Sequence, residues 1–316
     1  MHLKHPVKYL LVLLAVIFTG DRLLSLGLDQ LVIRSNTRLA RLYSGRATAD
    51  VVVLGNSRAN RAFFSPYIEK TLGRKTINLS YNALSTELAS VLMEDFLKRN
   101  GKPQLLIVEV TGVVMAPEAI NELKLYSHRS DRLAKIFKRE KTSAYYTSKV
   151  MNLFRLNGAE VIDSLQNLRS SDQTAMFRTP INDFLIKQVE AEPSVRFPEN
   201  GMDRMSASER REIRDKNLKA LTSIVQIARA QMIDLRLIVA PYWPRYRNKI
   251  EDWDQVLSEI QAATLGEPIW DYSSALIDSI DFGDRVHLTN TGSIHLVNLL
   301  EQDGFFAPHA LPKAKQ

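Results

Sequence analysis

The sequence predicts an α/β fold, a doubly wound parallel sheet, for most of this 316-residue chain. The run Asp50 to Gly55 is β-branched and apolar at consecutive positions, as in parallel strands buried on both faces. Similar runs follow at Thr76 to Leu79, Gln104 to Val110, Leu235 to Ala240 and Pro268 to Asp271. The stretches between them leave room for crossover helices, such as Glu87 to Arg99 and Ala207 to Gln231. In sheets of this kind ligands bind beyond the carboxyl ends of the strands, so functional residues are expected directly after them.

The chain is long enough for one main α/β domain, which we expect over residues 50–308. The strand pattern stops over residues 113–205, where polar sequence with aromatic clusters predicts a mostly helical insertion that caps or walls the cleft. A polar connector is expected over residues 35–49, and a disordered tail over residues 309–316.

Composition excludes several classes of protein. The formal net charge is +7, but basic residues alternate with acidic ones, as in Ser208 to Lys216, so nucleic-acid binding is not expected. There is no cysteine, which excludes disulfides, thiolate nucleophiles and cysteine-ligated metals.

The N-terminus, residues 1–34, has the composition of a membrane anchor. Lys4 and Lys8 precede an unbroken apolar run, Tyr9 to Thr19, and further leucines follow it. A cleaved signal peptide is the alternative, although the run lacks a small-x-small cleavage site. An amphipathic helix on a soluble core, which would fit a cytosolic hydrolase, is a third interpretation. We expect a single-pass anchor in the inner (cytoplasmic) membrane with the main domain on the periplasmic side, because Lys4 and Lys8 stay inside.

Ser57 follows the first expected strand in the sequence Gly55-Asn56-Ser57 and opens a helix. At that position a serine hydroxyl points into the cleft, and backbone N–H groups of the helix start can hold an oxyanion. The alternative is a serine that only caps the helix.

Asp284 and His287 lie near the end of the chain, just before the expected helix Thr291 to Leu300. A histidine can take a serine proton when a carboxylate fixes its tautomer and stabilises its charge, and Asp three residues before His permits that pairing. The alternative is a pair of loop residues beside the last helix.

Together these two motifs resemble the SGNH (GDSL-like) hydrolase superfamily, whose sheet is flavodoxin-like. The resemblance covers residues 50–112 and 230–302, and within the superfamily it is nearest to a membrane-anchored, cell-envelope branch whose first block begins Gly-x-Ser-Arg, here ending at Arg58. It implies that Ser57 is the nucleophile, His287 the base and Asp284 the residue that orients it, with Arg58 near the substrate.

The other two blocks of the superfamily depart from its pattern. No glycine follows the second strand, so Asn82 or the N–H of Ala83 is expected to serve the oxyanion hole instead. The Gly-x-Asn-Asp block is absent after the third strand, where the chain reads Glu109 to Gly112.

Other residues are secondary candidates. Trp243 and Arg245 follow the fourth strand and would suit stacking on a sugar ring, or they belong to a structural turn bounded by prolines. His128 and His295 are expected to be structural or exposed, and Glu109 is a candidate polar group at the cleft rim. No metal-ligand spacing and no phosphate-binding loop is found, so no metal and no cofactor is expected.

The sequence therefore predicts a serine-dependent esterase or O-acyltransferase that acts on an acylated cell-envelope or exopolysaccharide substrate. The alternative is a non-catalytic component that keeps the fold and binds polysaccharide or other envelope-assembly proteins.

Overall fold

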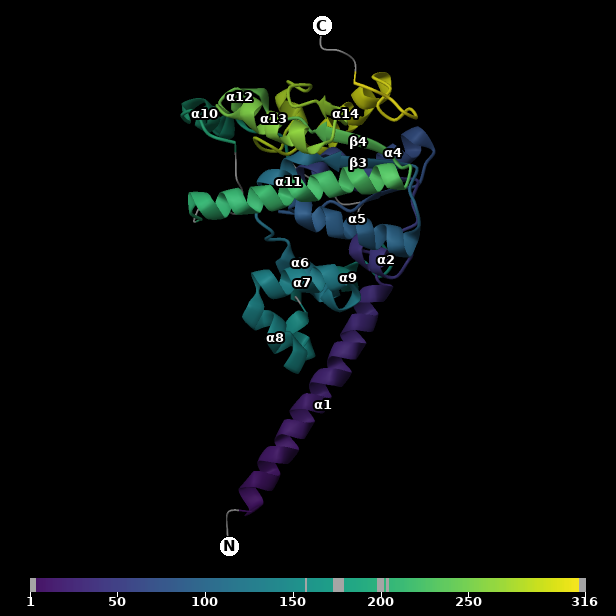
Figure 1. Ribbon diagram of the computed structural model, residues 1–316, viewed down its shortest axis with the longest axis vertical. Coiled ribbons are helices and arrows are strands. Elements are labelled where there is room, and N and C mark those ends of the chain that lie inside the picture. The colour runs from purple at the N-terminus through teal and green to yellow at the C-terminus, as the bar shows by residue number, and fades with distance from the viewer. Residues whose placement is uncertain (1–3, 157, 173–178, 198–201, 203–204, 313–316) are drawn as a thin grey trace. The chain divides into compact units, whose positions relative to one another are not determined.

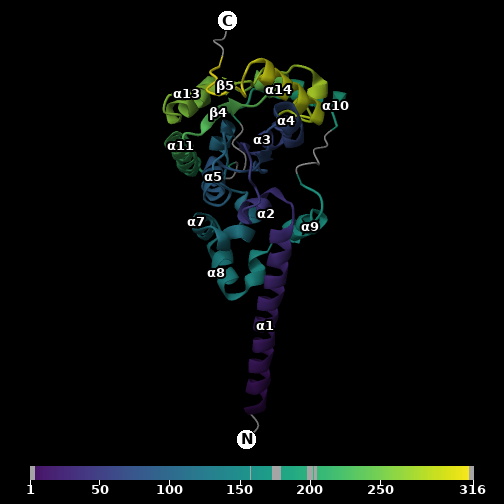
Figure 2. The same cartoon turned by 90° about the vertical axis from the view of Figure 1, so that its right-hand side faces the viewer.

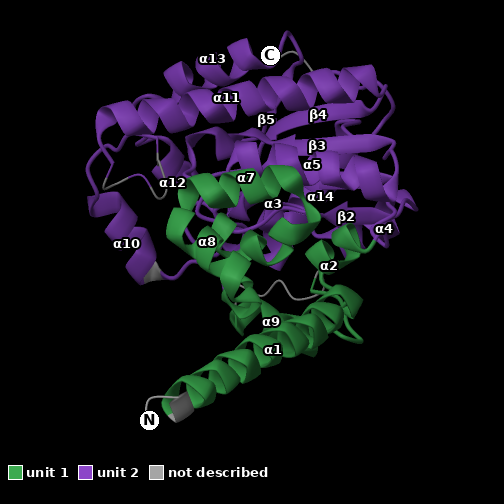
Figure 3. Ribbon diagram, turned by 60° about the horizontal axis from the view of Figure 1, so that its bottom comes forward, with its two compact units in different colours: residues 1–44, 120–172 green, residues 45–119, 173–316 purple. Residues whose placement is uncertain are grey.

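The computed structural model describes residues 4–156, 158–172, 179–197, 202 and 205–312. The chain divides into two compact units, which Figure 3 shows in different colours. Unit 1 comprises residues 1–44 and 120–172, and unit 2 comprises residues 45–119 and 173–316.

Unit 2 contains a parallel sheet, as the sequence predicts. Its strands are β1 (Val51–Leu54), β2 (Thr76–Asn78), β3 (Leu105–Glu109), β4 (Asp234–Val239) and β5 (Ile269–Asp271). Within the described residues these five strands lie in the order β2-β1-β3-β4-β5, and every neighbouring pair is parallel. The α/β class and the positions of the strands are therefore confirmed.

The helices of unit 2 lie on both sides of this sheet (Figure 2). They are α3 (Ser57–Ala62), α4 (Ser65–Leu72), α5 (Thr86–Asn100), η1 (Val110–Val114), α10 (Asp183–Ala191), α11 (Ala207–Ala230), α12 (Pro244–Arg247), α13 (Trp253–Ala263), η4 (Ser279–Asp281) and α14 (Asn290–Gln302). Helix α11 packs against α5 and α13 on one side, and α14 packs against α3 on the other. The chain moves from β1 to β2 in one direction along the sheet and from β2 through β3 to β5 in the other. Crossovers between parallel strands are generally right-handed, and such a reversal then puts helices on both faces.

The strands are apolar at consecutive positions because both faces of the sheet are covered. All four residues of β1 and all five of β3 are buried. Glu109, the last residue of β3, is 1% exposed, so the sheet carries a carboxyl group at the carboxyl end of its central strand.

Unit 1 consists of helices: α1 (Lys4–Arg34), α2 (Arg38–Tyr43), α6 (Ile120–Leu123), η2 (Lys124–Arg129), α7 (Asp131–Glu140), α8 (Thr142–Val150), η3 (Asn152–Arg155) and α9 (Gly158–Gln166). The expected connector, residues 35–49, includes α2, whose Tyr43 stacks on Tyr126 with ring centroids 4.8 Å apart. The mostly helical insertion therefore contributes to both units, with residues 120–172 in unit 1 and the rest of its described part in unit 2.

Helix α1 is long and apolar enough to cross a membrane over Pro6–Arg34, a property that signal sequences share (Figure 1). Residues 6–20 are all exposed, whereas Asp21, Ser25 and Asp29 are buried. The first half of α1 is thus an unpacked apolar helix, and one face of the second half packs within unit 1.

Some expectations fall on positions outside the described residues. These are the last part of the expected tail, residues 313–316, and parts of the insertion, residues 157, 173–178, 198–201 and 203–204.

Candidate active site

The structure brings Ser57, His287 and Asp284 together in unit 2, although 230 residues separate the serine from the histidine. His287 Nε2 lies 2.7 Å from Ser57 Oγ, and His287 Nδ1 lies 2.8 and 3.0 Å from the two carboxylate oxygens of Asp284. A carboxylate only accepts hydrogen bonds, so Nδ1 carries the proton and the lone pair of Nε2 faces the serine hydroxyl. This is the arrangement in which an imidazole can act as a general base toward serine.

The three residues are accessible from solvent. Ser57 is half-buried, and the side chains of His287 and Asp284 are 16% and 28% exposed. The three side chains thus lie at the surface of unit 2 and not in its interior.

Gly55 shapes the turn that presents Ser57. Its φ is +154°, and an added Cβ would lie 2.7 Å from the Cβ of Ala59 and 2.8 Å from the Cβ of Glu109. Any side chain here would separate the end of β1 from β3. The glycine lets the chain turn sharply into α3, so that Ser57 becomes the first residue of the helix.

Asn56 caps α3 and links it to β3. Its Oδ1 accepts from the backbone N–H of Arg58 at 2.8 Å, and its Nδ2 donates to Thr111 Oγ1 at 3.1 Å. The Thr111 hydroxyl in turn donates to the Glu109 carboxylate at 2.7 Å. Asn56, the residue before Ser57, is therefore held by hydrogen bonds to both the oxygen and the nitrogen of its side-chain amide.

Glu109 is fully enclosed at the base of this network. Burial raises the pKa of its carboxyl group, and the positive charge of Arg58 and the hydrogen bond from Thr111 act in the opposite direction. Glu109 is thus an interior group and does not form part of the cleft rim, where we expected it.

Arg58 is also in the interior, at 4% exposure. Its Nη2 donates to the carbonyl oxygens of Ala240 and Pro241, and its guanidinium carbon lies 3.3 Å from the centroid of the Tyr242 ring. The side chain of Arg58 thus lies below the surface, and its expected place near the substrate stays a prediction. Its guanidinium connects the start of α3 to the residues after β4 through Nη2 and the Tyr242 ring face, while its Nε and Nη1 are buried without a hydrogen-bond partner among the described residues.

The turn after β4 contacts the loop that carries Asp284 and His287. Trp243 is 2% exposed, so its ring offers no free face for a sugar, and its backbone N–H donates to the carbonyl of Arg285 at 3.1 Å. Arg245 is exposed and pairs with Glu190. The geometry favours the structural-turn interpretation of Trp243 and places Arg245 in an ion pair with α10.

The loop that carries Asp284 and His287 is fixed by its own backbone. Asp284 Oδ1 accepts from the N–H groups of Val286 and His287 at 2.9 and 2.8 Å, and Gly283 N–H donates to the carbonyl of His287 at 2.9 Å. Backbone N–H groups of this loop thus hold the carboxylate of Asp284, and that carboxylate in turn orients the imidazole of His287.

Arg285 and Glu192 are site residues that the sequence analysis missed. The Arg285 guanidinium forms two hydrogen bonds with the Glu192 carboxylate, of 2.9 and 3.0 Å, at the end of α10. No local pattern predicts a pair separated by 93 residues. Thr111 could have been found, because it closely follows a strand, as Ser57 does.

The loop after β2 lies beside the serine turn. Tyr81 N–H donates to the carbonyl of Gly55 at 3.2 Å, and Leu84 N–H closes a turn on the carbonyl of Tyr81. Within this turn Asn82 is exposed, and Ala83 has a φ of +53°, a left-handed conformation that favours glycine. The expected oxyanion donors thus lie on a tight turn bonded to the residue that precedes Asn56.

The remaining histidine candidates have partners of their own. His128 Nε2 lies 3.1 Å from Asp29 Oδ1 in unit 1, and His295 Nδ1 lies 2.7 Å from Asp281 Oδ1 in unit 2. Among the described residues, no group of three or more His, Cys, Asp or Glu side chains could hold a metal ion.

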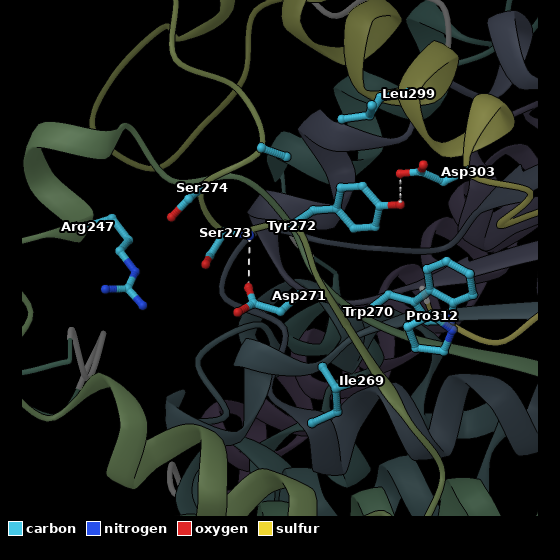
Figure 4. A pocket seen from close by; sticks show the side chains of 11 residues that line it. Arg247, Ile269, Trp270, Asp271, Tyr272, Ser273, Ser274, Leu299, Asp303 and Pro312 are labelled. Atoms are coloured by element: carbon cyan, nitrogen blue, oxygen red, sulfur yellow. Dashed lines mark hydrogen bonds between the residues drawn. The ribbon is translucent and has the colours of Figure 1, made fainter. Parts of the chain in front are cut away.

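A cavity of about 500 Å³ lies along β5, apart from the serine (Figure 4). It is lined by Arg247, Ile269, Trp270, Asp271, Tyr272, Ser273, Ser274, Ala275, Leu299, Asp303 and Pro312. Across it Tyr272 donates to Asp303 at 2.6 Å. Ser57, Asp284 and His287 do not line this cavity.

No family model matches the chain, and no curated protein matches it.

Proposed function

We propose that this protein is a membrane-anchored, serine-dependent esterase or O-acyltransferase of the SGNH type. The observation that carries the proposal is the continuous hydrogen-bond chain from Ser57 through His287 to Asp284. Serine alone is a weak nucleophile, and this chain supplies both the base and the group that orients it.

The reaction proceeds in two displacements. Ser57 Oγ attacks the carbonyl carbon of an ester while His287 Nε2 takes the hydroxyl proton. The tetrahedral intermediate collapses, the alkoxide leaves with the proton from His287, and the acyl group stays on Ser57 as an ester. Water or a sugar hydroxyl then attacks this ester, His287 takes its proton and returns it to Ser57, and the acid or the new ester is released.

The negative oxygen of each tetrahedral intermediate needs nearby donors. We assign this role to the turn that contains Asn82 and Ala83, because it is hydrogen-bonded to Gly55, two residues before the nucleophile. The backbone N–H of Ser57 is a further candidate, since the first residue of a helix has no acceptor within the helix.

The topology supports this assignment of the site. The parallel strand order 2-1-3-4-5 is the flavodoxin-like doubly wound order, and its ligand crevice lies where chain direction reverses, between β1 and β3. Ser57 follows β1, and Thr111 follows β3. Together with the sequence motifs, this placement supports the SGNH superfamily as the family of unit 2.

The location that we propose is the inner membrane, with unit 2 on the periplasmic side. Lys4 and Lys8 precede the exposed apolar half of α1, and positive charge is retained on the cytoplasmic side. A periplasmic site favours a surface polymer as substrate, so we propose an acylated envelope polysaccharide or exopolysaccharide, handled together with other envelope-assembly proteins.

A non-catalytic polysaccharide-binding component is the second candidate, favoured by one observation. Where the superfamily supplies an asparagine donor after the third strand, this chain has Thr111, whose hydroxyl is engaged with Glu109 and Asn56. Loss of one oxyanion donor typically costs about 10²–10³ in rate, so a protein without it could retain the cleft for binding alone.

Hydrolysis of p-nitrophenyl acetate by the full-length protein in detergent tests the proposal. We expect Ser57→Ala to abolish it and Ser274→Ala, a change of an exposed serine beyond β5, to leave it unchanged. Equal hydrolysis by wild type and Ser57→Ala would exclude the serine mechanism. A folded wild type without hydrolysis or acyl transfer would favour the binding candidate.

A further inference from the structure

We propose that the α8–η3 corner of unit 1 lies where the acyl chains meet the headgroup layer of the membrane that α1 crosses, and that it binds anionic lipid. The corner consists of Tyr146, Val150 and Phe154, with Lys138 and Lys149 beside them. This proposal rests on α1 crossing a membrane and is independent of the proposed enzymatic activity.

Asp21 indicates the depth at which this corner lies in the membrane. A membrane-crossing helix needs about 20 residues, and a span counted from Tyr9 ends near Leu28. Asp21 lies within that span, yet its side chain is 1% exposed. Its carboxylate accepts from the N–H groups of Asn152 and Leu153 at 2.8 and 3.0 Å.

A buried charge at this depth is tolerated because those N–H groups satisfy it. Residues 152 and 153 therefore lie at the level of Asp21, within the outer part of the span. The next residue, Arg22, also holds the corner at this level. Its guanidinium donates to the carbonyl of Val150 at 3.0 Å and lies 4.4 Å from the Phe18 ring.

Apolar side chains of the corner are exposed at the level of Asp21. Val150 is 63% exposed, Phe154 57% and Tyr146 53%. Tyr146 and Val150 are four residues apart on α8 and share one face of the helix. Apolar side chains of α1 are exposed at a similar depth, with Leu23 and Leu24 67% and 55% exposed.

Two lysines lie beside this apolar face. Lys138 and Lys149 are exposed, and their ammonium groups lie 5.4 Å from the Tyr146 ring and 5.0 Å from the Tyr145 ring. Aromatic side chains flanked by lysines are typical of the membrane interface, where the rings occupy the headgroup layer and the ammonium groups reach phosphate. Each lysine near an anionic surface adds to binding, so the face fits an acidic lipid leaflet.

The absence of cysteine from the sequence permits a direct depth measurement in the full-length protein. Single cysteines at Val12, Val150 and Leu168, all exposed positions of unit 1, are labelled with the fluorophore NBD in nanodiscs that contain phosphatidylglycerol. Quenching by lipids with nitroxides at the headgroup and deep in the acyl chain is then compared. Leu168 is the matched control, because its carbonyl binds Asn36, which lies about 22 Å along the chain from Asp21 at helical rise.

We expect NBD at Val150 to be quenched by the headgroup nitroxide about threefold more than NBD at Leu168. We expect NBD at Val12 to be quenched mainly by the deep nitroxide. Quenching at Val12 with none at Val150 above the Leu168 control overturns the proposal while keeping the anchor. Failure of quenching at Val12 removes the anchor, and the proposal with it.

A charge variant tests the lipid preference. Lys138→Glu with Lys149→Glu, in the Val150→Cys background, is expected to lose about half of the headgroup quenching in phosphatidylglycerol and little in phosphatidylcholine. Equal quenching in both lipids, before and after the charge change, contradicts anionic lipid binding. A fluorescence shift at Val150 without lipid quenching would indicate that protein covers this face, which also overturns the proposal.

Discussion

Arg285 and Glu192 are joined by two parallel hydrogen bonds, Nη1 to Oε2 at 2.9 Å and Nη2 to Oε1 at 3.0 Å. Arg285 lies between Asp284 and His287, so this pair attaches the loop that carries the base to the end of α10. The same helix end is held by Lys249, whose ammonium donates to the carbonyls of Val189, Glu190 and Glu192. The orientation of His287 therefore depends on a part of the chain more than 90 residues earlier.

Replacing Arg285 with lysine is expected to lower kcat about tenfold, because an ammonium group cannot form the paired bonds and the imidazole becomes less well oriented. Both partners are partly exposed, so the free energy of unfolding should change by less than about 1 kcal/mol. Steady-state kinetics and urea unfolding measure the two effects. Arg245→Lys is the matched control, since Arg245 pairs with Glu190 on the same helix; an equal kcat loss in both variants would argue against the link to His287.

Replacing Asp284 with asparagine should lower kcat by about 10⁴-fold while the fold is retained. The amide can donate to Nδ1 and so stabilise the tautomer whose Nε2 carries the proton, which leaves no base for Ser57. The measurement is ester hydrolysis by wild type and variant at equal melting temperature. Retention of more than about a tenth of the wild-type rate would show that Asp284 does not orient the base.

Replacing Gly55 with alanine should destabilise the protein by about 2–4 kcal/mol, because the new Cβ meets both Ala59 and Glu109 at less than 3 Å. Gly73→Ala is the matched control: Gly73 also has a positive φ, of +63°, but no atom lies within 4 Å of its added Cβ. Its cost should be about 1 kcal/mol from backbone conformation alone. Chemical unfolding of the two variants should separate them, and equal losses would contradict the packing described at Gly55.

Glu109 should make stability depend on pH. Burial raises its pKa above the ordinary value of 4.5, so the folded protein holds this proton at pH values where the unfolded chain has released it. The contribution of Glu109 to the free energy of unfolding is therefore fully present below about pH 4.5 and is lost as pH rises through the folded pKa. Glu109→Gln removes this titration, so the unfolding free energy of the variant minus that of wild type should increase with pH above 4.5. A difference that stays constant from pH 4 to 8 would show that the pKa is not raised.

The elements of unit 2 could be predicted because their burial leaves a sequence pattern. Strands covered on both faces are apolar at every position, as Val51 to Leu54 shows, and residues that follow parallel strands meet at one edge of the sheet. That rule, with Asp and His three residues apart and the resemblance to the SGNH superfamily, selected Ser57, Asp284 and His287 as candidates, and the structure places them in hydrogen-bond contact.

The burial of polar side chains could not be predicted in the same way. Arg58 and Trp243 were expected near substrate, but carbonyl oxygens and the Tyr242 ring hold Arg58 in the interior, and Trp243 packs below the surface. Glu192 was missed because its partner is remote in sequence. The segment that forms the short helix α2 was expected to be a connector. Its buried Tyr43 packs on Tyr126 in a distant segment, so no local pattern predicted the helix.

Covalent labelling with a fluorophosphonate tests whether His287 activates Ser57, because the probe reacts preferentially with a serine that a neighbouring base activates. On the full-length protein in detergent, we expect one adduct, located on Ser57 by mass spectrometry, absent in Ser57→Ala and formed far more slowly in His287→Ala. A folded wild-type protein that stays unlabelled, or an adduct on another serine that survives Ser57→Ala, would contradict the activation of Ser57 by His287.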